Sequence, residues 1–163
     1  MIHDLDAPDF RPPEGNYDVA VAGAGVAGIT LAVRLAALGR RVFLLEAGDR
    51  ALTAQSKALY AGRSTGHPYA NLTFARQRFL GGTSNHWGGW SRPLDPSDLG
   101  PRPWIPHAGW PIPSVELSRF LPAARAILGL SPVRPDRPMI GLTDPFNEIA
   151  FHFDPPVRFR DKY

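Results

Sequence analysis

Two short hydrophobic runs flank a longer segment whose apolar residues recur with helical spacing. The runs cover residues 17–22 and 41–45, and the segment between them extends from 29 to 38. Short runs rich in Val, Ala and Leu are typical of buried strands, whereas roughly ten residues with this spacing are typical of a helix. The pattern predicts a β-α-β unit over residues 17–48. We therefore expect an α/β fold with two parallel strands.

The first predicted strand passes into the helix through a glycine-rich turn. Gly23, Gly25 and Gly28 form the pattern Gly-x-Gly-x-x-Gly. The first glycine would make the tight turn, the second would let the backbone approach a pyrophosphate, and the third would let the helix pack on the strand. The N–H groups at the helix N-terminus, together with its partial positive charge, suit a diphosphate. The turn predicts a dinucleotide site, which we extend to Val26 and Ala27.

An acidic residue follows the second predicted strand. Glu46 lies about 18 residues beyond Gly28, close to the spacing expected for the acid that binds a ribose 2′-hydroxyl group. A carboxylate at this place repels a 2′-phosphate, so it favours adenosine cofactors without one. We expect Glu46 and Ala47 to contact the cofactor. The alternative is an ordinary strand-turn-helix segment with no ligand.

Outside this unit the pattern predicts an arm, a loop region and a further helix. Several prolines favour an extended arm over residues 1–16. From Ser114, a candidate N-cap, apolar residues recur with helical spacing. We expect a helix over residues 114–130 that is interrupted near Pro122 and ends at Gly129.

Composition and charge narrow the class of protein. The 163 residues are 44% hydrophobic, enough for one domain with a core. The formal net charge is +3 and the isoelectric point is near 9.7, but the arginines are scattered, so we do not infer nucleic-acid binding. There is no cysteine, which excludes disulfides and thiolate chemistry. With no long apolar run and an acidic start, we expect no membrane span and a cytoplasmic location.

Two glycine pairs bracket a group of small polar and aromatic residues in the middle of the chain. The pairs are at 81–82 and 88–89, and the residues between them are Thr83, Ser84, Asn85, His86 and Trp87. Such a segment can line a large planar ligand with backbone N–H groups and hydroxyls. The alternative is a surface loop, although exposure of a large apolar side chain such as that of Trp87 to solvent is unfavourable.

The glycine turn, Glu46-Ala47-Gly48 and the run at 78–89 (RFLGGTSNHWGG) together carry a family resemblance. The chain resembles the glucose-methanol-choline family of FAD oxidoreductases, and within it bacterial sugar dehydrogenases and pyranose oxidase-like enzymes. Segments at 92–95, 104–112 and 155–159 agree with this likeness. The resemblance implies a Rossmann-like FAD-binding domain, here an incomplete one, in which a β-α-β unit is followed by a loop-rich and helical extension.

The resemblance also implies how FAD would lie. The adenosine would rest on the glycine turn and Glu46, and the isoalloxazine ring would lie by a loop within residues 74–112. The loop residues that the resemblance assigns to the cofactor are Arg78, Gly81, Gly82, Thr83, Ser84, Asn85, His86, Trp87 and Gly88. His86 matches the position through which some relatives attach the flavin covalently, whereas many relatives hold FAD noncovalently.

The activity implied by the resemblance is oxidation of a CH–OH group of a sugar or alcohol, with hydride transfer to the flavin. The family's catalytic base, a histidine paired with a histidine or an asparagine near the C-terminus, matches nothing here, so no catalytic residue is assigned. We expect a truncated FAD-binding part that lacks the substrate domain and is inactive alone. The alternatives are a small flavin-carrying module without catalysis and a noncatalytic interaction fragment.

Overall fold

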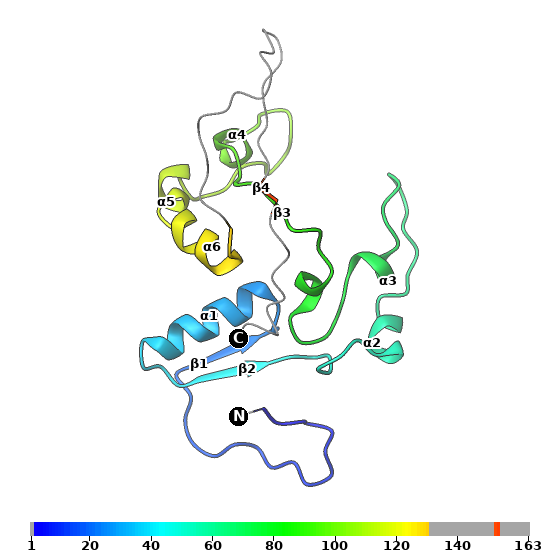
Figure 1. Ribbon diagram of the computed structural model, residues 1–163. Helices are drawn as coiled ribbons and strands as arrows, with labels where there is room; N and C mark the ends of the chain where they lie inside the picture. The colour runs from blue at the N-terminus through cyan, green and yellow to red at the C-terminus, as the bar shows by residue number, and fades with distance from the viewer. Residues whose placement is uncertain (1, 131–151, 154–163) are drawn as a thin grey trace. The chain divides into compact units, whose positions relative to one another are not determined.

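The computed structural model describes residues 2–130 and 152–153 (Figure 1). These residues form two compact units, one over residues 2–83 and the other over residues 84–130 with 152–153. We call them the first and the second unit. The segment at 155–159 that supported the family resemblance lies outside the described residues.

The first unit is built on a β-α-β element. Strand β1 (Val19–Ala22) pairs in parallel with β2 (Val42–Leu45), and helix α1 (Val26–Ala37) connects them. The register runs from Val19 opposite Val42 to Ala22 opposite Leu45. Helix α1 lies along one face of the two strands (Figure 1). The α/β class expected from the hydrophobic pattern agrees with this arrangement.

The core of the first unit lies between β1, α1 and a later segment. Its buried hydrophobic residues are Val21, Ala24, Ile29, Ala32 and Phe79. Ile29 and Ala32 are three positions apart, so both lie on the helix face that covers the strands. Phe79 joins this core from far along the chain.

A glycine follows the C-terminal end of helix α1, in a conformation that other residue types rarely adopt. Gly39 has φ +77°, in the left-handed region, and its N–H donates to the carbonyl of Ala36. The N–H of Arg40 donates to the carbonyl of Leu35. This pattern satisfies the last carbonyls of the helix and turns the chain into β2.

Two short helices follow β2 in the first unit. Helix α2 (Ala54–Ala58) is capped by the Thr53 side chain, which accepts from the N–H of Ser56. Helix α3 (Leu72–Ala75) is capped by Asn71, whose side chain accepts from the N–H of Thr73. Both caps satisfy N–H groups that a short helix leaves without partners.

The arm over residues 2–16 differs from the extended segment expected from its prolines. The N–H of Ala7 donates to the carbonyl of Asp4, and that of Phe10 donates to the carbonyl of Ala7. The Asp4 carboxylate also accepts from the N–H of Asp6. The arm therefore contains two consecutive turns over residues 4–10. The aspartate side chain stabilises the first of them through the N–H two residues on.

The second unit combines short helices with one small strand pair. Strand β3 (Trp90–Ser91) pairs antiparallel with β4 (His152–Phe153), and helix α4 (Pro96–Leu99) follows β3. The 3₁₀-helix η1 (Gly82–Asn85) spans the boundary of the two units. Leu99 is the one buried hydrophobic residue among the described residues of the second unit, and tryptophans such as Trp104 are largely exposed.

The stretch 114–130 forms two helices. They are α5 (Ser114–Ser118) and α6 (Leu121–Leu128), and Gly129, at φ +67°, caps the second. Pro122 lies in the first turn of α6, where its missing N–H costs no hydrogen bond. The N-cap of α5 is Pro113, so the N-cap expected at Ser114 lies one residue too late.

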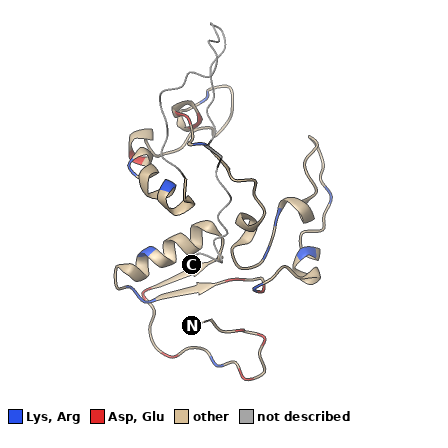
Figure 2. Ribbon diagram, in the orientation of Figure 1, with Lys and Arg blue, Asp and Glu red and all other residues tan. Residues whose placement is uncertain are grey.

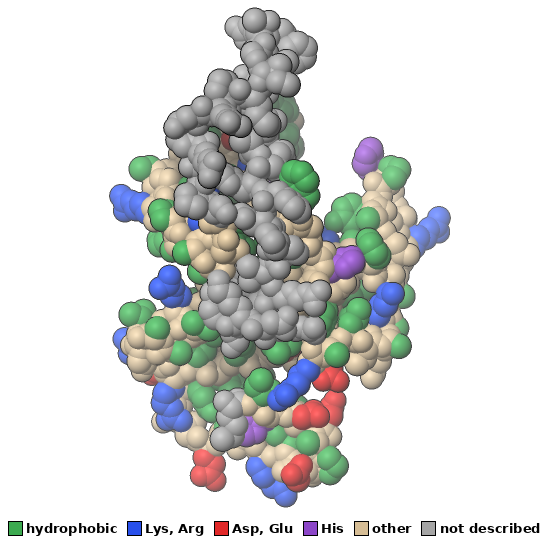
Figure 3. Space-filling view, viewed as in Figure 1, with side chains coloured by type: hydrophobic (Ala, Val, Ile, Leu, Met, Phe, Trp, Pro, Cys, Tyr) green, Lys and Arg blue, Asp and Glu red, His purple; other side chains and the backbone are tan. Residues whose placement is uncertain are grey.

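The surface carries mixed charges and scattered apolar groups. Lys and Arg positions, like Asp and Glu positions, are scattered over the described elements (Figure 2). Hydrophobic side chains appear on the visible surface of the described residues (Figure 3). No helix in residues 2–130 combines the length and the apolar character needed to cross a bilayer.

Candidate functional site

The glycine turn between β1 and α1 is closed by backbone contacts. Gly23 has φ +98°, and its N–H donates to the carbonyl of Leu45 at 2.7 Å. A Cβ atom on Gly28 would lie 1.8 Å from the carbonyl oxygen of Gly23. Since no side chain fits at that distance, Gly28 lets the first turn of α1 pack against the turn. The roles expected for these two glycines match the geometry.

Gly25 has a different environment. It is the N-cap of α1 in an extended conformation, and a Cβ atom there would meet nothing within 4 Å. No side chain caps this helix end, and its first turn has no acidic residue. Open space therefore lies over a helix N-terminus of positive partial charge, as binding of an anion requires.

The Glu46 carboxylate is held in place at the end of β2. Its Oε2 atom accepts from the N–H of Ala24, and its Oε1 atom accepts from the N–H of Gly48, both at 2.8 Å. Because a carboxylate offers about four acceptor positions, each oxygen can still accept from a ligand hydroxyl. The half-buried Glu46 side chain therefore joins the glycine turn to the loop after β2.

The segment at 78–82 lies against this same turn. The N–H of Gly81 donates to the carbonyl of Ala24 at 2.8 Å, which forms a parallel bridge between Gly25 and Gly81. The N–H of Leu80 donates to the carbonyl of Asp49 at 2.9 Å. The two glycine-rich motifs, more than fifty residues apart, are therefore in direct backbone contact.

Two residues outside the predicted cofactor contacts, Ser56 and Gly48, fix this segment. The buried Ser56 donates a hydrogen bond from its Oγ atom to the carbonyl of Arg78. A Cβ atom on Gly48 would lie 2.3 Å from the same carbonyl oxygen. Gly48 thus allows the close approach of the backbones, and Ser56 anchors α2 to it. A serine in a short helix carries no sequence signal that would have indicated this contact.

These elements enclose a cleft of about 550 Å³ in the first unit. Its volume lies in the range of small-molecule sites. Its lining residues are Leu5, Ala22, Gly23, Gly25, Leu45, Glu46, Ala47, Tyr60, Gln77, Arg78 and Gly82. Six of these residues were predicted from the sequence. The other five, Leu5, Ala22, Leu45, Tyr60 and Gln77, were not, because no binding motif singles them out.

Residues 18–72 match the model of a protein family described as FAD binding domain. FAD is the cofactor of this chain. The matched segment contains the glycine turn, Glu46 and α2, and it supports an FAD-binding portion of a flavin-dependent oxidoreductase. Searches of curated proteins and of solved structures found no match.

The other predicted FAD contacts in the first unit, Val26, Ala27, Gly81 and Thr83, are not among the residues that line the cleft. Val26 and Ala27 are exposed in the first turn of α1, and Gly81 is buried in its bridge to Gly25. Thr83 accepts, through its Oγ1 atom, a hydrogen bond of 3.2 Å from the N–H of Gln77. This bond closes the loop that carries Arg78 and Gly81.

The remaining predicted FAD contacts belong to the second unit. They are Ser84, Asn85, His86, Trp87 and Gly88, of which His86 and Gly88 are exposed. The described geometry of the cleft involves the first unit, so the contact of these residues with the flavin stays a prediction.

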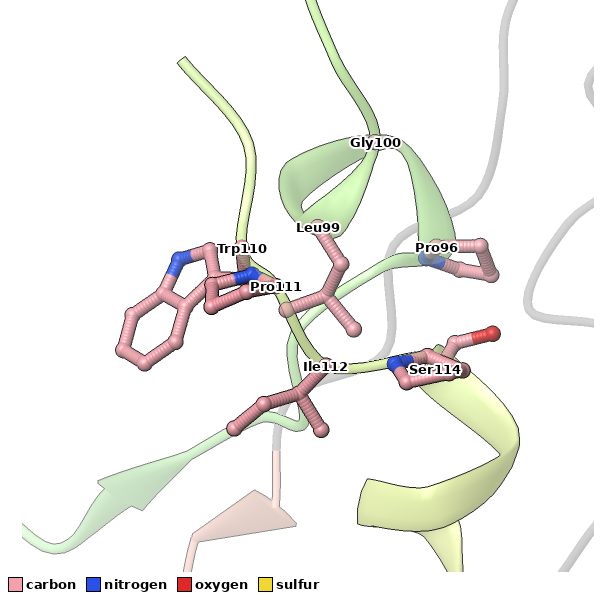
Figure 4. Close-up of a pocket in the computed structure, with 8 residues that line it drawn as sticks. Pro96, Leu99, Gly100, Trp110, Pro111, Ile112 and Ser114 are labelled. Atoms are coloured by element: carbon pink, nitrogen blue, oxygen red, sulfur yellow. The ribbon is translucent and has the colours of Figure 1, made fainter. Parts of the chain in front are cut away.

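The second unit has a cavity of its own, of about 410 Å³ (Figure 4). Pro96, Leu99, Trp110 and Ile112 lie around it, and no titratable side chain lines it. Across the described residues, no three His, Cys, Asp or Glu side chains gather as a metal site would require. The cleft of the first unit is therefore the better candidate for cofactor chemistry.

Proposed function

We propose that the first unit binds the adenosine diphosphate half of FAD in its cleft. The diphosphate lies over Gly25 and the N-terminus of α1, where backbone N–H groups and the helix dipole favour negative charge. The ribose hydroxyls donate to Glu46. The observation that carries this proposal is the fixed Glu46 carboxylate, which lines the same cleft as Gly23 and Gly25.

Arg78 supplies positive charge to this site. It is the one Lys or Arg residue among those that line the cleft, and its backbone is anchored by Ser56. A guanidinium group forms charge-assisted hydrogen bonds with phosphate oxygens, often two at once. We assign Arg78 to the diphosphate, in agreement with its place in the run at 78–89.

The second part of the proposal concerns the reaction. The run at 78–89 supports a glucose-methanol-choline-type oxidoreductase that acts on the CH–OH group of a sugar or alcohol. FAD supplies the hydride acceptor in such a reaction. The residues of this chain bind and orient the cofactor: the glycine turn and Arg78 hold the diphosphate, Glu46 holds the ribose, and the loop at 81–88 faces the flavin. We assign no catalytic base within the chain.

Titration of the full chain with FAD, FMN and NADP tests the cofactor site. We expect FAD to bind more tightly than FMN, which lacks the adenosine, and more tightly than NADP, whose 2′-phosphate meets Glu46. Glu46→Gln should remove most of the preference over NADP, whereas Glu116→Gln, an exposed change in α5, should leave it unchanged. Equal affinity for FAD and FMN would contradict the proposed site.

A further inference from the structure

The N-terminal arm contributes a side chain to the cofactor cleft. The arm lies before the segment that matches the FAD-binding family model, yet Leu5 lines the cleft together with Gly23 and Glu46. Leu5 is 52% exposed, which leaves an apolar surface of the side chain open to a ligand. The arm thus forms part of the lining of the cleft through Leu5.

Local hydrogen bonds hold Leu5 in this position. It lies inside the turn in which the N–H of Ala7 donates to the carbonyl of Asp4. The rings of His3 and Phe10 pack edge to face, with centroids 6.4 Å apart, and bring the two ends of the turn region together. The conformation that presents Leu5 is therefore set within the arm.

Tyr60 lines the same cleft from another segment. It follows α2 directly, and its N–H donates to the carbonyl of Lys57 at 3.1 Å, which extends the helix by a turn. The hydrogen bond from Ser56 to the carbonyl of Arg78 fixes α2 against the cleft. The half-buried Tyr60 therefore follows a helix that is fixed beside the cleft.

We propose that Leu5 and Tyr60 bind the adenine ring of FAD, an inference that rests on the proposed binding of the ribose by Glu46. Adenine is bonded directly to that ribose, so it must lie within one sugar of Glu46. Leu5 and Tyr60 are the large apolar and aromatic side chains that reach the cleft from outside the β-α-β element. A flat heteroaromatic base binds to such groups by stacking and apolar contact.

The test compares ADP with CDP on the full chain, because the two ligands share the ribose and the diphosphate and differ only in the base. The wild-type chain should bind ADP more tightly than CDP. Leu5→Ala and Tyr60→Ala should each weaken ADP binding by about 3- to 10-fold, the effect expected for loss of one aromatic or apolar contact, and should bring the ADP-to-CDP ratio toward one. Tyr60→Phe keeps the ring and should keep the ratio.

Two variants serve as controls. Ile2→Ala changes an exposed apolar residue of the same arm, and Tyr69→Ala removes an exposed tyrosine, and neither residue lines the cleft. Both should bind ADP like the wild type. If Leu5→Ala and Tyr60→Ala retain the wild-type ADP-to-CDP ratio while ADP still binds, the adenine assignment is wrong and the proposed function stands. If the wild-type chain binds neither FAD nor ADP, the proposed function fails and the adenine assignment fails with it.

Discussion

The backbone N–H of Gly81 donates a hydrogen bond to the carbonyl of Ala24 at 2.8 Å. This bond joins the glycine turn after β1 to the second glycine-rich segment. Ala24 is 1% exposed and Gly81 is buried, so the bond is shielded from water. The arrangement couples the glycine turn at one end of the cleft to the segment that carries Arg78, and changes on either side should affect both.

Gly28 should be required for stability. In Gly28→Ala the new Cβ atom would lie 1.8 Å from the carbonyl oxygen of Gly23, so the helix or the turn must shift. We expect a loss of about 1–3 kcal/mol in the free energy of unfolding, as for other overpacked positions. Chemical denaturation measures it. Gly62→Ala, where a Cβ atom meets nothing within 4 Å, is the control; equal stability of the two variants would show that α1 is not packed as described.

Gly25 should be required for FAD binding and not for folding. A Cβ atom there meets nothing within 4 Å of the protein, so Gly25→Val should keep the helical content. The valine side chain would occupy the space over the N-terminus of α1, so retention of FAD should be lost. Flavin absorbance after gel filtration measures retention, and circular dichroism measures the helix. An unchanged flavin content would place the diphosphate elsewhere.

Glu46→Ala should reduce both stability and affinity. It removes the acceptor for the N–H groups of Ala24 and Gly48, as well as that for the ribose. We expect FAD affinity to fall by about 1–3 kcal/mol, the scale for a hydrogen bond to a charged group. Calorimetric titration gives the affinity and thermal unfolding gives the stability. A variant that is destabilised but binds FAD normally would assign Glu46 a structural role alone.

Ser56 should stabilise the segment of the cleft that carries Arg78. Ser56→Ala leaves the half-buried carbonyl of Arg78 without its side-chain donor. The expected cost is about 1 kcal/mol in unfolding free energy, because a half-buried acceptor loses its partner. Ser64→Ala, at an exposed position of the loop after α2, is the matched change and should be neutral.

His86 should hold the flavin covalently if the family resemblance extends to this function. Acid precipitation of the FAD-loaded chain would then leave the flavin mass in the pellet, and His86→Ala would release it. His67→Ala, which changes another exposed histidine, should keep the flavin in the pellet. Complete release of flavin from the parent chain would show that any contact by His86 is noncovalent.

The parts of the fold that local sequence determines were predictable. The hydrophobic runs and the spacing of Gly23, Gly25 and Gly28 define the β-α-β element, since strand, turn and helix each depend on neighbouring residues. Glu46 was found by its distance along the chain. Its contacts with the N–H groups of Ala24 and Gly48 were not, because they depend on how the turn and the later loop meet in space.

Other features depend on tertiary contact or on competing local effects. The hydrogen bond from Ser56 to the carbonyl of Arg78 leaves no mark in the sequence pattern. The Asp4 side chain stabilises the first of the two turns of the arm, although the prolines there favour extended backbone. The stretch at 114–130 forms two helices because Pro122 fits the first turn of a new helix better than the interior of a long one.

The bond between Gly81 and Ala24 also bears on how relatives of this chain would be recognised. The two glycine motifs are fixed to each other through space, whereas the chain between them includes residues 61–70, all exposed. Exposed loops tolerate insertions and deletions, so evolution can change the length of this interval without moving either motif. A search profile that requires a constant separation would overlook such relatives, while one that fixes each motif and leaves the interval free would retain them.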